Sequence, residues 1–167
     1  GDPHKLFVSG DSAGGNLAAA VSIMARDNKG PNIKSQLLLY PVTDVSSFDR
    51  KSYRDYADGY MLLEKDMKWY RDLYISKQNQ VFDPLISPFL CGKLSGLPAA
   101  YVVTAEFDIL RDEGEQYAEK LFQNSVTVSC TRYNGVIHGF LSMDKILEKS
   151  ESFYREISEE VRNLLIA

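Results

Sequence analysis

Cysteine and clustered positive charge are scarce in this sequence, and it has no long apolar run. Its two cysteines, Cys91 and Cys130, lie far apart in 167 residues. They could pair, but isolated cysteines in a domain of this size more often remain thiols, which favours a reducing compartment such as the cytoplasm. Lys and Arg number 19 against 23 Asp and Glu, a net charge of −4 without a basic cluster. We therefore expect neither nucleic acid nor an anionic membrane as a partner.

Targeting and membrane segments are also missing from the sequence as given. No apolar stretch reaches the length of a membrane span, and no signal peptide opens the chain. The length suits one domain with one sizeable core. A hydrophobic content of 44% and a charged content of 25% are typical of a soluble globular protein.

What the sequence does contain is an alternation of strands and helices. Four apolar runs predict strands at residues 5–9, 35–40 and 99–105 and from Val126 to Tyr133, the last one at a sheet edge. Helical periodicity is found at residues 13–28, 64–76 and 112–124, and in a last helix with apolar residues from Ile146 to Leu165. Short strand–helix–strand units predict a mostly parallel sheet with helices on both faces. Residues 44–96 break the alternation and form an insertion of the kind that becomes a lid or pocket wall.

One stretch joins the first strand to the first helix through a glycine-bounded turn, which reads G-D-S-A-G from Gly10 to Gly14. In a nucleophile elbow a strand turns sharply into a helix and lifts a serine hydroxyl clear of the sheet. Such a turn needs room on either side of the serine, which Gly10 and Gly14 supply. We therefore expect an elbow made of Gly10, Asp11 and Gly14 around a nucleophilic Ser12. The alternative is a glycine-rich turn with a bystander serine.

Two further polar residues follow strands in the same way. Catalytic groups of open α/β sheets collect at the carboxyl ends of the strands, where Ser12, Asp108 and His138 are all expected. Their order along the chain is the triad order of α/β-hydrolases. An imidazole activates the serine hydroxyl by taking its proton, and a carboxylate orients and stabilises that imidazole. The other histidine, His4, lies in an N-terminal turn and is expected to be solvated.

Each member of this set has a structural alternative. Taken alone, His138 is equally well explained as a loop histidine. Asp108 competes with Glu106, Asp112 and Glu113 for the role of the acid. Asp112 and Glu113 suit the first turn of a helix, where negative charge complements the helix dipole. Asp108 is the carboxylate expected on the exposed turn.

The motifs together resemble the hormone-sensitive-lipase family of esterases. The residues that carry the resemblance are Gly10-Asp11-Ser12-Ala13-Gly14-Gly15-Asn16, Asp83-Pro84, Glu106-x-Asp108-x-Leu110-Arg111-Asp112-Glu113-Gly114 and His138-Gly139-Phe140. The match runs from residue 1 to about residue 141. It implies an α/β-hydrolase fold in which Ser12 is the nucleophile, Asp108 the acid and His138 the base. It also implies that the amide of Ala13 is one oxyanion donor.

The sequence departs from the family at one end. The family carries a His-Gly-Gly-Gly motif that donates the other oxyanion amides, about four more strands and part of the cap, all upstream of the elbow. We therefore expect residues 1–167 to be a single partial domain, the C-terminal part of the fold, with a partial cap at about residues 44–96. Such a piece is expected to be inactive alone, and its elbow strand to be an unpaired apolar edge.

The function implied is hydrolysis of short- to medium-chain carboxylic esters through an acyl-enzyme, without cofactor or metal. A non-catalytic binding module derived from a hydrolase, or an amidase or peptidase with the same triad, are the alternatives. A homodimer through the edge strand from Val126 to Tyr133 is expected by analogy. Candidate pocket aromatics, for most of which core packing is the better explanation, are Tyr40, Trp69, Tyr70, Phe89 and Phe140.

Overall fold

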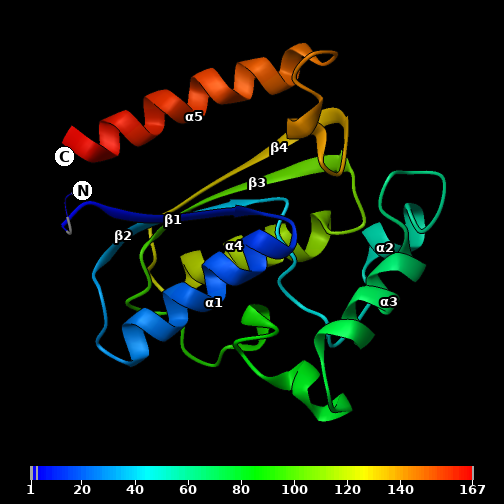
Figure 1. Ribbon diagram of the computed structural model, residues 1–167, viewed down its shortest axis with the longest axis horizontal. Helices are drawn as coiled ribbons and strands as arrows, with labels where there is room; N and C mark the ends of the chain where they lie inside the picture. Colours follow the sequence, from blue (N-terminus) through cyan, green and yellow to red (C-terminus); the bar gives the residue numbers. More distant parts are fainter. Residues whose placement is uncertain (1, 3, 167) are drawn as a thin grey trace.

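Four parallel strands form one sheet in the order β1-β2-β3-β4. The computed structural model in Figure 1 describes residue 2 and residues 4–166, and the side chains of residue 160 and residues 163–166 lie outside the description. The strands are β1 (Leu6–Asp11), β2 (Ile33–Leu39), β3 (Ala99–Phe107) and β4 (Val128–Ile137). All three neighbouring pairs are parallel. The expected parallel sheet is confirmed.

Helices cover both faces of the sheet (Figure 1). On one face α1 (Ala13–Asp27) and α4 (Arg111–Gln123) enclose a core of small and branched side chains. On the other face α5 (Glu148–Ile166) buries Phe153 and Ile157 against Val103 and Ala105. The expected helix from Ile146 onward therefore begins two residues later, and its predicted apolar positions Leu164 and Leu165 lie outside the described side chains.

The long segment between β2 and β3 contains the expected helix, α3 (Glu64–Tyr74). It also contains α2 (Lys51–Asp55) and the 3-10 helices η1 (Gln78–Phe82) and η2 (Pro88–Leu90), which the apolar periodicity did not predict. These elements are too short to show helical periodicity. A third cluster of buried apolar side chains, Tyr53 and Met67 among them, holds this segment against Ile109 and Leu110.

β4 is longer than predicted. Residues Asn134 and Gly135, expected in a loop, lie inside the strand. The pairing with β3 shifts between Ala105 and Phe107, so that Tyr133 and Ile137 are their respective partners. Gly135 adopts a positive φ of 74° in this irregular stretch, a conformation that glycine adopts without steric cost. The strand therefore ends one residue before His138.

β1 pairs on one side only, with β2, among the described residues. The unpaired edge is therefore as expected. Leu6 is 38% exposed, and no residue of β1 is fully buried. The apolar stripe of α1 is exposed too: Leu17, Val21 and Met24 lie on its outer face while Ala18, Ala19 and Ile23 pack on the sheet.

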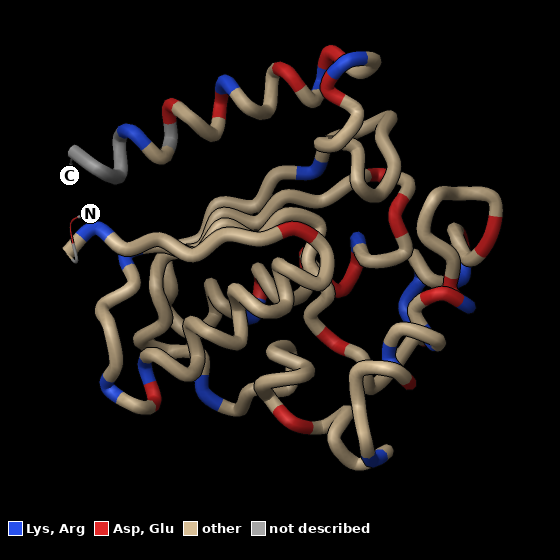
Figure 2. Tube along the Cα trace, in the orientation of Figure 1, with Lys and Arg blue, Asp and Glu red and all other residues tan. Residues whose placement is uncertain are grey.

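Charged residues lie on the helices and loops around a sheet whose strands carry few of them (Figure 2). Blue and red segments alternate along α5 and around α2 and α3, without a basic face (Figure 2). Within the described part of the chain, none of the helices is long and apolar enough to span a bilayer. Cys91 is buried and Cys130 exposed, and they are not joined in a disulfide. β4 is an edge strand, as expected, and pairing of two copies along it stays a prediction.

Candidate active site

The turn between β1 and α1 holds Ser12 in an unusual backbone conformation. β1 ends at Asp11, α1 begins at Ala13, and Ser12 between them has φ 54° and ψ −118°. A positive φ is uncommon for a residue with a side chain and indicates strain where the surroundings enforce it. The surroundings do so here: the N–H of Ser12 donates to the Leu39 carbonyl at 2.9 Å, and its carbonyl accepts from the N–H of Val42 at 3.1 Å. The end of β2 therefore fixes the turn that holds Ser12.

The glycines of the elbow differ in how tightly they are confined. A Cβ on Gly10 would lie 2.2 Å from the Gly14 carbonyl oxygen, so glycine is required there. A Cβ on Gly15 would lie 2.7 Å from the Cβ of Pro41. A Cβ on Gly14 would meet Asp11 Oδ1 at 3.8 Å, an ordinary contact. Among the described residues, space therefore demands glycine at positions 10 and 15, and the expectation that Gly14 must also be small is not supported.

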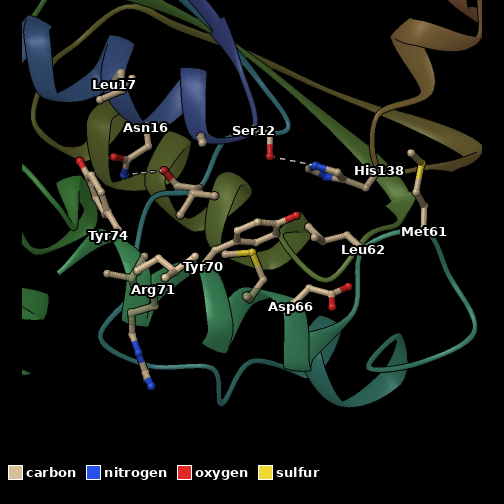
Figure 3. Close-up of a pocket in the computed structure, with 15 residues that line it drawn as sticks. Ser12, Asn16, Leu17, Met61, Leu62, Asp66, Tyr70, Arg71, Tyr74 and His138 are labelled. Carbon is tan, nitrogen blue, oxygen red and sulfur yellow. Dashed lines mark hydrogen bonds between the residues drawn. The ribbon is translucent and has the colours of Figure 1, made fainter.

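Ser12, His138 and Asp108 form a hydrogen-bonded chain at the carboxyl ends of three strands. The distance between Ser12 Oγ and His138 Nε2 is 3.0 Å (Figure 3), and that between His138 Nδ1 and Asp108 Oδ2 is 2.7 Å. A carboxylate can only accept, so Nδ1 carries the ring proton and Nε2 is left to accept from the serine hydroxyl. This is the arrangement in which a serine oxygen becomes a nucleophile.

The acid is held rigidly. Asp108 is 1% exposed, and its second oxygen, Oδ1, accepts the N–H of Leu110 at 2.9 Å. Arg111 braces the turn by donating to the Glu106 carbonyl at 3.0 Å and to the Tyr56 hydroxyl at 3.1 Å. The carboxylate is therefore fixed at both oxygens.

The competing carboxylates have other partners. Glu106 accepts the N–H of Gly135 at 2.6 Å. Asp112 accepts the N–H of Ser52 at 2.7 Å and pairs with Arg111. Asp108 is the carboxylate that reaches His138.

Glu113 is fully buried and joins α4 to the segment that follows β2. Its Oε1 accepts the N–H groups of Thr43 at 2.6 Å and Asp44 at 3.2 Å, and its Oε2 accepts the Tyr53 hydroxyl at 3.2 Å. Burial raises the pKa of Glu113 to about 8, although the two N–H donors and the charge of Arg50 favour the ionised form. The sequence placed Glu113 at a helix start, where a solvated carboxylate is common, and gave no sign of this burial.

A cavity of about 570 Å³ opens beside Ser12. Figure 3 shows that its walls come from α1, from α3 and from the loop with Met61 and Leu62. Asp66 and Arg71 of α3 also contribute, with the Arg71 guanidinium directed away from Ser12 (Figure 3). The remaining walls are mostly apolar, made by residues such as Leu17, Val42, Val45, Met67, Tyr70, Leu73 and Tyr74. Tyr70, Leu73 and Tyr74 are about half-exposed or more, so they form a wall of the cavity and are not part of the core.

Of the five candidate pocket aromatics, Tyr70 lines this cavity. Tyr40 and Phe140 are instead buried in the core under α5, and Phe89 packs under α1 and α4 between the cations of Arg50 and Lys120. Trp69 is 59% exposed beside Tyr70. The positions of Tyr40, Phe89 and Phe140 in or against the core agree with core packing, the better explanation for most of the five.

Sequence reasoning missed several functional positions. The Asn16 side chain donates to the carbonyls of Val42 at 3.0 Å and Ile86 at 2.9 Å, and thereby ties α1 to both ends of the inserted segment. Met61 and Leu62 line the cavity from a loop without periodicity. Asn16 could have been found as a polar residue on the small-residue face of a predicted helix. No sequence pattern pointed to Met61 or Leu62.

The start of α1 faces the same cavity. Ala13, the first residue of the helix, lines it together with Ser12 and His138. N–H groups in a first helical turn have no partner within the helix and attract negative charge. Among the described side chains, no group of three or more His, Cys, Asp or Glu is arranged to hold a metal ion.

Comparisons with known proteins agree with this geometry. A family model described as alpha/beta hydrolase fold matches residues 1–142. The chain is 37% identical over 165 residues to a carboxylic ester hydrolase, LipN, of Mycobacterium tuberculosis, covering 96% of this chain and 44% of that protein. It is 41% identical over 143 residues to an arylesterase of Saccharolobus solfataricus, covering 84% of this chain and 45% of that protein.

Among solved structures, a hyperthermophilic esterase from the archaeon Pyrobaculum calidifontis superposes with a TM-score of 0.94 at 40% identity. That superposition covers 99% of this chain and 55% of the other chain. The chain thus spans about half the length of the relatives it matches.

Proposed function

The chain belongs to the alpha/beta hydrolase fold family, among the esterases related to hormone-sensitive lipase, and from this premise we propose that the intact protein is a serine carboxylesterase. The observation that carries the proposal is the hydrogen-bonded chain from Ser12 through His138 to Asp108, with distances of 3.0 and 2.7 Å. Support also comes from the relatives, which bear the names carboxylic ester hydrolase and arylesterase.

The reaction follows from the roles of the three side chains. Ser12 Oγ attacks the ester carbonyl while its proton moves to His138 Nε2, and Asp108 stabilises the imidazolium that forms. Collapse of the tetrahedral intermediate breaks the bond to the alcohol oxygen, which takes the proton from His138 and leaves an acyl-Ser12 ester. Water then gives a proton to His138 and attacks the acyl carbon. Collapse of this second intermediate breaks the bond to Ser12 Oγ, which takes the proton back from His138, and the acid is released.

The oxyanion of both tetrahedral intermediates needs N–H donors. The amide of Ala13, at the start of α1, is the donor this chain supplies. We assign the remaining donors to a segment of the intact protein outside these 167 residues, since the chain spans 44% of LipN. Loss of one such donor lowers turnover by roughly 10²–10³-fold in serine hydrolases, so the 167-residue chain by itself is proposed to have little activity.

The proposed substrates are esters with short- to medium-length apolar acyl groups. The cavity of about 570 Å³ beside Ser12 supports this choice, because its walls are mostly apolar side chains of α1 and α3. Apolar walls favour apolar substrate groups by removing both from water. We propose that the protein works in a reducing compartment, because Cys91 and Cys130 are both free thiols.

The test is hydrolysis of p-nitrophenyl esters by the intact protein and by its S12A variant. S12A is expected to lose nearly all activity, because it removes the oxygen that attacks the ester carbonyl. S158A is the control, since Ser158 is exposed on α5 and does not line the cavity, and it is expected to keep wild-type turnover. Activity that survives in S12A contradicts the assignment.

Two further measurements separate the alternatives. An organophosphate should label Ser12 covalently in the intact protein, whereas a binding module derived from a hydrolase would remain unlabelled. Turnover of the matching p-nitroanilide at the rate of the ester would favour an amidase or peptidase.

A further inference from the structure

Tyr40 combines burial with a strained backbone immediately after β2. It is 3% exposed and has a φ of 34°. A positive φ is an outlier for a bulky aromatic residue and costs roughly 1–3 kcal/mol where the surroundings enforce it. Residues with such strained backbones cluster at functional sites, which suggests that the turn at Tyr40 positions a neighbouring group.

The segment around Tyr40 is held from three directions. Its N–H donates to the Val103 carbonyl of β3 at 2.6 Å. On either side of it, Leu39 and Val42 make the two backbone hydrogen bonds to Ser12 described above. The next residue, Pro41, is wedged between two glycines, with 2.7 Å to a Cβ built on Gly15 and 3.6 Å to one built on Gly114. The backbone of Tyr40 is therefore fixed relative to the nucleophile.

The fixed backbone directs the Tyr40 ring at the base. Its centroid lies 4.8 Å from that of the His138 ring at an interplanar angle of 64°, and 5.8 Å from the Phe140 ring at 62°. Both angles describe edge-to-face contacts, which are favourable for aromatic pairs. His138 and Phe140 thus both contact the Tyr40 ring.

This contact restricts a motion that the triad hydrogen bonds leave open. The bonds to Asp108 and Ser12 hold the two ring nitrogens of His138, but once the bond to Ser12 is broken only the bond to Asp108 opposes rotation of the ring about its Cβ–Cγ bond. During turnover the base must also release Ser12 and face the leaving alcohol. A contact on the flank of the ring persists through that change.

We propose that Tyr40 is a positioning residue for His138. The strained turn after β2 holds the Tyr40 ring, and this ring keeps the imidazole oriented through both halves of the reaction. The proposal rests on the proposed esterase function. The ring and not the hydroxyl carries the effect. Burial and the neighbouring Asp11 carboxylate, to which the hydroxyl is hydrogen-bonded, raise the pKa of the Tyr40 phenol far above its usual range, so the ring carries no charge beside His138.

The rival explanation is that Tyr40 only fills the core. Phe153 provides the matched control, because it is 1% exposed in the same cluster and contacts Phe140 with centroids 6.5 Å apart. Its other ring contacts are to Tyr133 and Tyr154. F153L therefore removes a buried ring from the same core without removing a ring contact of the base.

The experiment compares Y40F, Y40L and F153L in the intact protein. Y40F is expected to keep kcat within about twofold of wild type. Y40L is expected to lower kcat roughly 10- to 100-fold with KM within about twofold, the result of a misoriented catalytic group. F153L is expected to lower Tm at least as much as Y40L while keeping kcat. If Y40L does not fold, Y40G replaces it, because glycine adopts a positive φ without strain.

Three kinetic results would overturn the proposal: wild-type kcat in Y40L, an equal loss of kcat in F153L, or a comparable loss of kcat in Y40F. The Nδ1 proton of His138, observed by NMR, provides a readout that needs no turnover. We expect a slowly exchanging signal in wild type and Y40F that is broadened in Y40L, and an unchanged signal in Y40L contradicts the proposal. Loss of the signal in H138Q assigns it to His138. If the wild type hydrolyses no ester, the proposed function fails and the NMR comparison decides the role of Tyr40 by itself.

Discussion

Asp108 uses its two oxygens for two different partners. Oδ1 accepts the backbone N–H of Leu110 and Oδ2 faces His138 Nδ1. In D108N the amide oxygen is expected to keep the bond to Leu110, which turns the amide NH₂ toward Nδ1. Nδ1 must then accept, so the ring proton moves to Nε2, where it blocks proton transfer from Ser12.

D108N should therefore lower kcat of the intact protein by roughly 10³–10⁴-fold while the fold persists. The measurement is steady-state hydrolysis of a p-nitrophenyl ester, with circular dichroism to confirm folding. D112N is the control, since Asp112 pairs with Arg111 and Ser52, and it is expected to keep kcat within a few-fold. A D108N variant with more than a tenth of wild-type kcat would refute the tautomer argument.

The three side chains of the proposed triad were predictable from the sequence for a physical reason. Parallel strands end at one edge of a sheet, so Ser12, Asp108 and His138, each just past a strand, had to come close together. Tyr40 and Glu113 were not predictable in their roles. Burial and side-chain direction at these positions depend on how the segment after β2 crosses α1 and α4, which periodicity does not encode.

At the scale of elements, the contact between α1 and the segment after β2 depends on a missing side chain. Gly15 leaves room for Pro41, and a Cβ there would lie 2.7 Å from the proline Cβ and 3.0 Å from its Cα. G15A is expected to destabilise the protein by about 1–3 kcal/mol, since overpacking outweighs a gain in helix propensity of at most about 1 kcal/mol.

Urea unfolding measures this effect, with G14A as the neighbouring control. A Cβ on Gly14 has an open position, with its nearest contact at 3.8 Å. G14A is therefore expected to be as stable as the wild type or slightly more so, because alanine favours the helix. Equal stability of G15A and G14A would show that Pro41 moves aside.

The elements themselves were largely predictable. All four strands and the helices α1, α3, α4 and α5 follow the apolar pattern to within a few residues. The outer face of α1 shows the limit of this pattern, since Leu17, Val21 and Met24 have helical spacing but face outward. Apolar spacing reports which residues share a face of a helix, and it does not report what lies against that face.

At the scale of the whole molecule, Glu113 links stability to pH. Burial raises the pKa of Glu113 to about 8 from an ordinary 4.5. Between these two values the folded protein holds the proton while the unfolded chain has released it. Stability contributed by this group is therefore fully present below about pH 4.5 and is lost as pH rises toward and through about 8.

E113Q should flatten this dependence. The glutamine amide oxygen can still accept from Thr43 and Asp44, and its NH₂ group can donate to the Tyr53 hydroxyl, so the network survives without a titrating group. Tm measured from pH 5 to pH 9 is expected to fall less steeply in E113Q than in the wild type. E119Q, on the exposed side of α4, should follow the wild type, and a wild-type slope in E113Q would contradict the argument.

The separation of the triad along the chain gives the site a place in the order of folding. Ser12 and His138 are 126 residues apart, while His138 and Asp108 are 30 apart. β1 and β4 occupy opposite ends of the sheet, with β2 and β3 between them. A contact with such a long loop to close forms late, because the entropy lost on closure must be met before the contact stabilises anything. During refolding, Ser12 should therefore become reactive toward an organophosphate only after most of the helical signal has returned. Its reactivity then reports when the sheet is complete.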